Sequence, residues 1–192
     1  MPSSNPLRFD ESTVVVSALH FAAQKHRDQR RKDNVTPYIN HPIDLLTILT
    51  CEADIRDPEV LAAALLHDTL EDTDTQPEEL TQLFGVRIRD LVLEMTDDKS
   101  LSQAERKRLQ QQHAPALSYK ARLIKLADKT ANLRDLIVAP PLNWSLQRKQ
   151  EYFEWAKSVV DQIRGTHATL EGIFDQAYAG KPQGVPCSLH YP

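Results

Sequence analysis

The stretch ALLHDTLEDT, residues 64–73, decides how the fold of this chain is interpreted. It ends an apolar run that begins at Val60, and the run is followed within eight positions by one histidine and several acids: His67, Asp68, Glu71, Asp72 and Asp74. A continuous apolar run is typical of a buried element. If it is a helix, each residue advances by about 100°, so the first four of these side chains fall within roughly 140° of one another.

Two explanations account for this cluster of ionisable groups. Ionised carboxylates beside apolar surface are costly unless something compensates them. The acids could form the solvated C-terminal end of a helix, although acids at that end oppose the helix macrodipole. Alternatively, they could bind a divalent cation, because imidazole and carboxylates together make a standard mixed nitrogen and oxygen ligand set. This segment alone leaves both explanations open.

Two further segments bear on the choice. PYINHPIDLL places His41 at the start of an otherwise apolar helix, where a single histidine is more often a packed or capping residue than a ligand. LIKLADKTANLRDLI places Asp128, Asn132 and Asp135 in a polar stripe within an apolar surround. Such a stripe is either a buried hydrogen-bond network or a site. The polar side chains on one helix face cannot satisfy all of one another's hydrogen-bonding groups, so a partner that they share is favoured.

The rest of the chain predicts an all-α fold. It contains only five glycines, and no alternating run is long enough to indicate a sheet. We expect one compact helical bundle of about eight to ten helices, spanning residues 10–180, between an N-terminal tail 1–9 and a disordered C-terminal tail 181–192. The sequence leaves open whether the polar segment 97–113 is ordered. Helices are predicted over these ranges: 13–29, 38–52, 59–70, 75–85, 86–96, 102–113, 118–137, 145–165 and 167–180.

Composition limits the classes of partner. The net charge of −4 gives no reason to expect long nucleic acid as a partner, although five basic residues lie within 25–32. Cys51 and Cys187 have no metal-binding spacing and are interpreted as reduced thiols. No apolar run approaches the roughly 20 residues of a membrane span, and the N-terminus has no secretory signal. We therefore expect a soluble cytoplasmic protein. We interpret EYFEWA, residues 151–156, as packing rather than ligand binding.

The order of His41, His67-Asp68 and Asp128 resembles the metal-binding pattern of the HD phosphohydrolase superfamily. Three blocks are more specific: FAAQKHRDQRRKDNVTPYINHP (21–42), AALLHDTLEDT (63–73) and KLADKTANLRDL (125–136). They are similar to the stand-alone (p)ppGpp hydrolases, the Mesh1-like relatives of the hydrolase domain of RelA/SpoT proteins. The similarity runs from about residue 10 to about residue 175. The resemblance implies that residues 10–180 form an HD phosphohydrolase domain.

The resemblance also implies a role for each matching residue. The ligands of the family's usual ion, Mn²⁺, match His41, His67, Asp68 and Asp128. The acidic pair that handles protons and orients water matches Glu71 and Asp72. The groups that contact the nucleotide match Arg31, Lys32 and Asn132. Two departures point to the stand-alone branch: the loop RRKDNVTPY lacks the Ser-Gly that long bifunctional members often have, and Asp135 stands where they usually have Thr.

The implied reaction removes the 3′-diphosphate of ppGpp, the stringent-response alarmone, and yields GDP and pyrophosphate. The implied partner is thus a small nucleotide, ppGpp or pppGpp. Two alternatives remain open. With the same fold and metal, the protein could be an NADPH 2′-phosphatase or another HD nucleotide phosphohydrolase. It could also be a non-catalytic nucleotide-sensing HD module, although the intact Glu71-Asp72 pair argues against a sensor. The oligomeric state is left open by the sequence.

Overall fold

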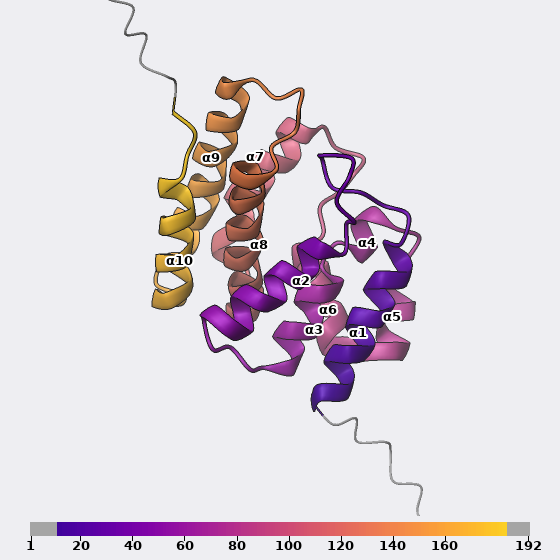
Figure 1. The fold of residues 1–192 in the computed structure, drawn as a ribbon. Coiled ribbons are helices and arrows are strands. Elements are labelled where there is room, and N and C mark those ends of the chain that lie inside the picture. The colour runs from indigo at the N-terminus through magenta and orange to yellow at the C-terminus, as the bar shows by residue number, and fades with distance from the viewer. Residues whose placement is uncertain (1–10, 184–192) are drawn as a thin grey trace, which may run out of the picture.

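The computed structural model describes residues 11–183, which form helices joined by short loops (Figure 1). Within this part of the chain the β-structure is limited to one antiparallel bridge between Arg30 and Pro37. The predicted all-α bundle is confirmed. The α-helices are α1 (Glu11–Lys25), α2 (Asn40–Thr47), α3 (Pro58–Leu66), α4 (Thr69–Asp72), α5 (Pro77–Phe84), α6 (Val86–Met95), α7 (Gln103–His113), α8 (Tyr119–Val138), α9 (Leu146–Val160) and α10 (Ala168–Ala179).

Several predictions concern the ends of the chain. The predicted tail 1–9 and residues 184–192 lie outside the described residues, as does Cys187. Residues 181–183 carry no regular secondary structure.

Cys51 is an exposed free thiol. The polar segment 97–113 is folded, because most of it forms α7. None of the helices in residues 11–183 is long and apolar enough to cross a lipid bilayer.

Helix α3 is a central element of the bundle. The Asp57 side chain caps it by accepting a hydrogen bond from the Glu59 amide at 2.9 Å, and Pro58 occupies the first turn, where its missing N–H costs nothing. Every residue from Val60 to Leu66 is buried. The helix packs against α1, α2, α6 and α8, so the apolar run predicted from the sequence is the core of the fold.

Helix α8 is the second central element. It stands between the pair α9 and α10 and the group α2 and α3 (Figure 1). Ser118 caps it, and most of its residues from Ala121 to Leu136 are buried. Because Asp128 lies in the middle of this buried stretch, its carboxylate is held inside the molecule rather than on its surface. The start of α2, the end of α3 and the middle of α8 together frame the candidate site.

The end of α3 differs from the sequence-based expectation of one helix over 59–70. The helix ends at Leu66, His67 and Asp68 form a turn, and α4 begins at Thr69. Side chains take over the carbonyl groups that the helix end leaves free: His67 Nδ1 lies 2.8 Å from the Ala64 oxygen, and the Thr69 hydroxyl donates to the Leu66 oxygen at 2.7 Å. Glu71 and Asp72 therefore lie in the first turn of α4, where the helix macrodipole favours negative charge.

Candidate metal centre and catalytic cavity

Three buried side chains from three helical segments meet at one point. One ligand atom each from His41, His67 and Asp128 lies within 4.8 Å of the others. His41 Nε2 is 3.3 Å from Asp128 Oδ1, and His67 Nε2 is 4.0 Å from the same oxygen. His41 comes from the first turn of α2, His67 from the turn after α3 and Asp128 from α8. The structure thus brings together three of the four predicted ligands in a single cluster.

The orientation of the His67 ring suits a metal ligand. Its Nδ1 faces the Ala64 carbonyl oxygen, which can only accept a hydrogen bond, so Nδ1 carries the proton. Its Nε2 is buried and points at carboxylate oxygens of Asp68, 3.0 Å away, and of Asp128, 4.0 Å away, which are the groups that would share a cation with it. A backbone carbonyl that fixes the tautomer in this way is a common feature of metal-bound histidines. Two imidazoles and a carboxylate form a donor set that fits a divalent cation.

Asp68 lies beside this cluster. Its Oδ2 is 3.0 Å from His67 Nε2 and 3.9 Å from His41 Nε2, so the carboxylate faces both imidazoles. It is nevertheless not among the atoms that lie mutually within 4.8 Å. The fourth predicted ligand, Asp68, therefore lies next to the other three but outside the group of atoms that are mutually within 4.8 Å.

Asp128 has two further neighbours on its own helix. Its Oδ2 is 3.0 Å from the buried Lys129 ammonium group, and its Oδ1 accepts a hydrogen bond of 2.6 Å from Asn132 Nδ2. The stripe identified in the sequence is thus both a hydrogen-bond network and part of the candidate site. Lys129, which the sequence analysis did not single out, supplies a positive charge beside the metal cluster and packs 4.4 Å from the centre of the Trp155 ring.

Glu71 and Asp72 project from α4 and are held by separate sets of donors. Arg106 Nη1 donates to Glu71 Oε1 at 3.0 Å, and the Asp97 amide donates to Glu71 Oε2 at 3.2 Å. Burial, together with neighbouring carboxylates, raises the pKa of Glu71 above its usual value. Asp72 Oδ1 accepts a hydrogen bond from Lys99, and Asp72 Oδ2 lies 3.2 Å from the Tyr38 hydroxyl oxygen. Both acids are therefore oriented by the protein.

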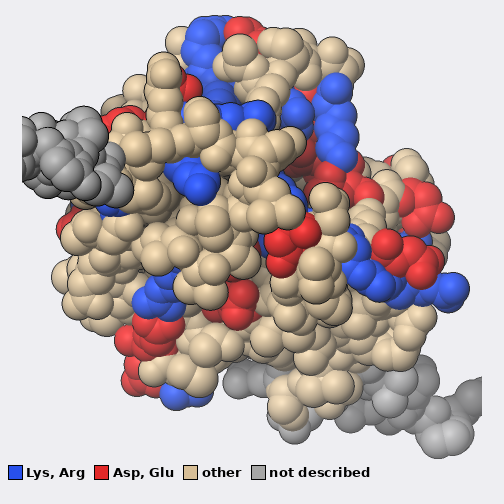
Figure 2. Space-filling model, turned by 45° about the horizontal axis from the view of Figure 1, so that its top comes forward, with Lys and Arg blue, Asp and Glu red and all other residues tan. Residues whose placement is uncertain are grey.

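The group of candidate metal ligands, His41, His67 and Asp128, is called the metal cluster here. It opens into a cavity of about 290 Å³. Basic and acidic groups share its wall, and Figure 2 shows Lys and Arg side chains standing beside Asp and Glu on the face brought forward there. A cavity of mixed charge can hold a cation and an anionic ligand side by side. Its lining contains every predicted site residue except His67: Arg31, Lys32, His41, Asp68, Glu71, Asp72, Asp128 and Asn132.

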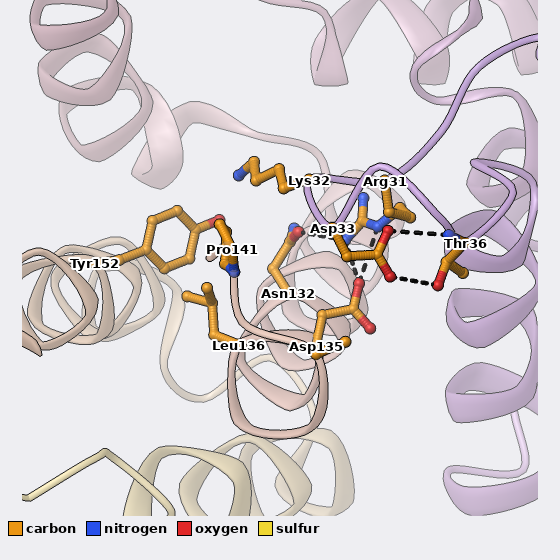
Figure 3. Close-up of a pocket in the computed structure, with 10 residues that line it drawn as sticks. Arg31, Lys32, Asp33, Thr36, Asn132, Asp135, Leu136, Pro141 and Tyr152 are labelled. Atoms are coloured by element: carbon orange, nitrogen blue, oxygen red, sulfur yellow. Dashed lines mark hydrogen bonds and ion pairs between the residues drawn. The ribbon is translucent and has the colours of Figure 1, made fainter. Parts of the chain in front are cut away.

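Arg31 is anchored rather than free in the cavity. Its Nε donates to Asp135 Oδ2 at 2.9 Å, one Nη group also contacts Asp135, and the same group donates to Asn132 Oδ1 at 3.1 Å (Figure 3). Only 12% of the Arg31 side chain is exposed. Asp135, identified in the sequence as part of the polar stripe and as a departure from the bifunctional members, therefore fixes this arginine together with Asn132.

Lys32 lies among aromatic rings. Its ammonium nitrogen is 5.2 Å from the ring centres of both Trp144 and Tyr152. Burial, with the charges of Arg31 and Lys129, lowers the pKa of Lys32 to about 8. Cation–π contacts offset part of the cost of removing the ammonium group from water.

Other parts of the cavity wall were not predicted. The interpretation of 151–156 as packing holds for Phe153, which is fully buried, but Tyr152 and Trp155 also line the cavity. In the basic run, Lys25 pairs with Asp74 outside the cavity, whereas Arg30 lines it. Arg106 gave no sequence signal, because its partner Glu71 lies 35 positions away.

Comparisons with known proteins agree over most of the chain. A family model described as HD domain matches residues 18–152. A Xenopus tropicalis protein named guanosine-3′,5′-bis(diphosphate) 3′-pyrophosphohydrolase MESH1 is 54% identical over 169 residues, which cover 88% of this chain and 94% of that protein. The Homo sapiens protein of the same name is 57% identical over 162 residues, covering 84% and 90%. A solved structure, described as a metazoan ortholog of SpoT that hydrolyzes ppGpp and plays a role in starvation responses, is 50% identical and has a TM-score of 0.83, covering 93% of this chain and 96% of that one.

Proposed function

This chain belongs to the HD domain family, and we propose that it is a metal-dependent hydrolase that converts ppGpp to GDP and pyrophosphate. The predicted resemblance to stand-alone (p)ppGpp hydrolases is confirmed by relatives that match most of the chain. The observation that carries the proposal is the single cavity lined by a metal cluster, two oriented carboxylates and several basic groups. We further propose that the protein acts in the cytoplasm and that residues 10–180 form its catalytic domain.

We propose Mn²⁺ as the resident ion, held by His41, His67, Asp68 and Asp128. The geometry supports His41, His67 and Asp128 directly, and Asp68 faces both imidazoles. When bound, a divalent cation lowers the pKa of a coordinated water and offsets negative charge on phosphoryl oxygens. Nitrogen and carboxylate donors of this kind suit Mn²⁺, although affinity alone does not select it over other first-row metals.

In the proposed reaction, Glu71 is the general base. It takes a proton from the water whose oxygen attacks the phosphorus next to the 3′-oxygen of the ribose, and the bond between that phosphorus and the 3′-oxygen breaks. The 3′-oxygen gains a proton, so that GDP and pyrophosphate result. The raised pKa of Glu71 supports this role, because a more basic carboxylate accepts a proton more readily. Asp72, which accepts a hydrogen bond from Lys99 and lies beside the Tyr38 hydroxyl, orients the water or assists the leaving group.

The basic groups of the cavity can neutralise the negative charge of the substrate. A nucleotide with two diphosphates is highly anionic, and the cavity already holds several carboxylates. We propose that Arg31 contacts the guanine base, that Lys32 contacts phosphate, and that Asn132 contacts the nucleotide. Lys107 and Lys129 line the same cavity, and Lys129 adds positive charge 3.0 Å from Asp128. Local charge of this kind can draw in an anion even though the chain is acidic overall.

Product analysis tests the proposed function. The purified protein is incubated with Mn²⁺ and either ppGpp or NADPH, and the products are separated by anion-exchange chromatography. We expect GDP and pyrophosphate from ppGpp. NADH and phosphate as the main products would instead support the NADPH phosphatase alternative. Nucleotide binding without any turnover would support a sensing module and would contradict the proposal.

The first prediction concerns recognition by Arg31. Asp135 and Asn132 hold the guanidinium through its N–H groups, and the Tyr38 ring centre lies 5.5 Å from its central carbon, so we expect a base to stack on the remaining face. Lysine keeps the positive charge but lacks the planar guanidinium group and the pair of N–H donors that contact Asp135. We expect Arg31→Lys to raise the KM for ppGpp by at least about tenfold, or about 1.4 kcal/mol. The KM is measured at two salt concentrations.

The control for this prediction is Arg27→Lys, which changes an exposed arginine paired with Asp28 outside the cavity. It should leave the KM unchanged. If Arg31→Lys behaves like wild type and both proteins show the same strong salt dependence, Arg31 supplies only positive charge and the stacking hypothesis is wrong.

The second prediction follows from the pKa of Lys32, which lies at about 8. A lysine is positively charged below its pKa, so the charge that attracts phosphate is lost as the pH rises through 8. We expect kcat/KM for ppGpp to fall between pH 7 and pH 9 in wild type. Lys32→Arg keeps its charge over this range and should show a smaller fall. Equal slopes in the two proteins would assign the pH dependence to another group.

A further inference from the structure

The Tyr38 hydroxyl connects two carboxylates for which different roles are proposed above. It donates to Asp68 Oδ2 at 2.5 Å and lies 3.2 Å from Asp72 Oδ2. Asp68 faces the two histidines of the metal cluster, whereas Asp72 belongs to the acidic pair on α4. Tyr38 reaches both from the loop that precedes α2, some thirty positions earlier in the chain.

The oxygen of Asp68 that Tyr38 contacts is also the one that faces the imidazoles. Asp68 Oδ2 is 3.0 Å from His67 Nε2 and 3.9 Å from His41 Nε2. A carboxylate can rotate about its last bond, and a donor placed on one oxygen limits that rotation. The Tyr38 hydroxyl therefore sets which oxygen of Asp68 is presented to the cluster.

The ring that carries this hydroxyl is itself held in place. The His26 ring stacks on Tyr38 with 4.7 Å between ring centres, and His26 is almost fully buried. His26 Nδ1 lies 2.7 Å from Gln29 Oε1, and Gln29 Nε2 donates to the backbone oxygen of Asp72 at 2.6 Å. The same small assembly thus fixes the tyrosine ring and the backbone of Asp72.

We propose that Tyr38 is a positioning residue that orients Asp68 toward the metal cluster and Asp72 toward the substrate. The Asp72 part of this inference rests on the function proposed above, whereas the Asp68 part concerns metal affinity alone. Groups that orient metal ligands typically contribute 10- to 100-fold in metal affinity or activity. A tyrosine that only packed the loop onto α4 would contribute through its ring and not through its hydroxyl.

Tyr38→Phe tests the inference, because it removes the hydroxyl and keeps the stacked ring. Mn²⁺ affinity is measured by titration calorimetry without substrate, and we expect it to fall by about 10- to 100-fold. At saturating Mn²⁺ we expect kcat for ppGpp to remain at least about tenfold below wild type, with little change in KM. The thermal unfolding midpoint, measured in the absence of metal, should stay close to that of wild type.

The matched control is Tyr178→Phe. The Tyr178 hydroxyl donates to Glu154 at 2.9 Å, and neither residue lines the cavity. This variant should keep wild-type Mn²⁺ affinity and kcat. Wild-type Mn²⁺ affinity in Tyr38→Phe would overturn the Asp68 part of the inference, whatever the substrate is. A kcat fully restored by excess Mn²⁺ would overturn the Asp72 part. Failure of ppGpp hydrolysis in wild type would count against the proposed function and leave the calorimetric result valid.

Discussion

Asp128→Asn should bind Mn²⁺ at least about a hundredfold more weakly than wild type, beyond the usual effect of residues that only orient ligands. Asp128 is the one carboxylate of the buried cluster, and its Oδ1 lies 3.3 Å from His41 Nε2 and 4.0 Å from His67 Nε2. Asparagine keeps the shape but removes the negative charge that attracts a cation. Hydrolysis of ppGpp should be lost in parallel. Calorimetric titration with Mn²⁺ and metal analysis of the purified variant measure the effect.

The variant also leaves Lys129 buried without its counter-charge, which typically costs about 3–5 kcal/mol of stability. A second variant separates folding from metal binding: Asp128→Asn with Lys129→Met removes both charges, so it should recover thermal stability without recovering Mn²⁺ affinity. Asp161→Asn, directly after α9 and outside the cavity, controls for the loss of one carboxylate. Near-wild-type Mn²⁺ affinity in a folded Asp128→Asn protein would contradict the ligand assignment.

The comparison between Asp128 and Asp68 bears on how many ligands the site has. The sequence resemblance implies four, whereas the structure groups three ligand atoms closely and leaves Asp68 beside them. If Asp68 is a full ligand, Asp68→Asn should weaken Mn²⁺ binding about as much as Asp128→Asn does. A clearly smaller effect would mean that Asp68 acts mainly through its contact with the histidines and with Tyr38.

Local sequence patterns were enough to predict much of the fold. The apolar run 60–66 is buried throughout, and the stripe on α8 faces the site, because both patterns depend only on local geometry. Periodicity could not predict that α3 stops at Leu66. At that point the side chains of His67 and Thr69 contact carbonyl oxygens at the helix end, and residue spacing in the sequence does not predict such contacts.

The contacts that hold the site residues in place escaped prediction for a different reason. Arg31 and Asp135 are 104 positions apart, and Arg106 and Glu71 are 35 apart. Such pairs form only when α4, α7 and α8 pack together. A single sequence therefore does not predict which charged residues will form ion pairs. Tyr38 is similar: its position beside the metal-binding block indicates that it could line the pocket, but its contacts with Asp68 and Asp72 depend on how the segments pack.

Glu71→Gln should retain Mn²⁺ and lose at least about a hundredfold in kcat, the usual scale for a general acid–base group. Glu71 is not part of the metal cluster, and its carboxylate is held by Arg106 and by the Asp97 amide. Glutamine has nearly the same shape but cannot accept the proton of the attacking water. Steady-state kinetics with ppGpp at saturating Mn²⁺ measure the loss. Glu154→Gln, on α9 and outside the cavity, is the matched control.

A loss of activity in Glu71→Gln has a second possible source, because both carboxylate oxygens of Glu71 face N–H donors. The amide of glutamine must turn its own N–H₂ group toward either Arg106 or the Asp97 amide, which breaks one hydrogen bond. Arg106→Lys and Glu71→Asp distinguish the two sources. If Glu71 is the base, Arg106→Lys should lose little and Glu71→Asp should recover part of the activity that Glu71→Gln lacks, because it restores a carboxylate. If the hydrogen bonds alone matter, Arg106→Lys should be as impaired as Glu71→Gln. Near-normal turnover by Glu71→Gln would show that the reaction needs no carboxylate at this position.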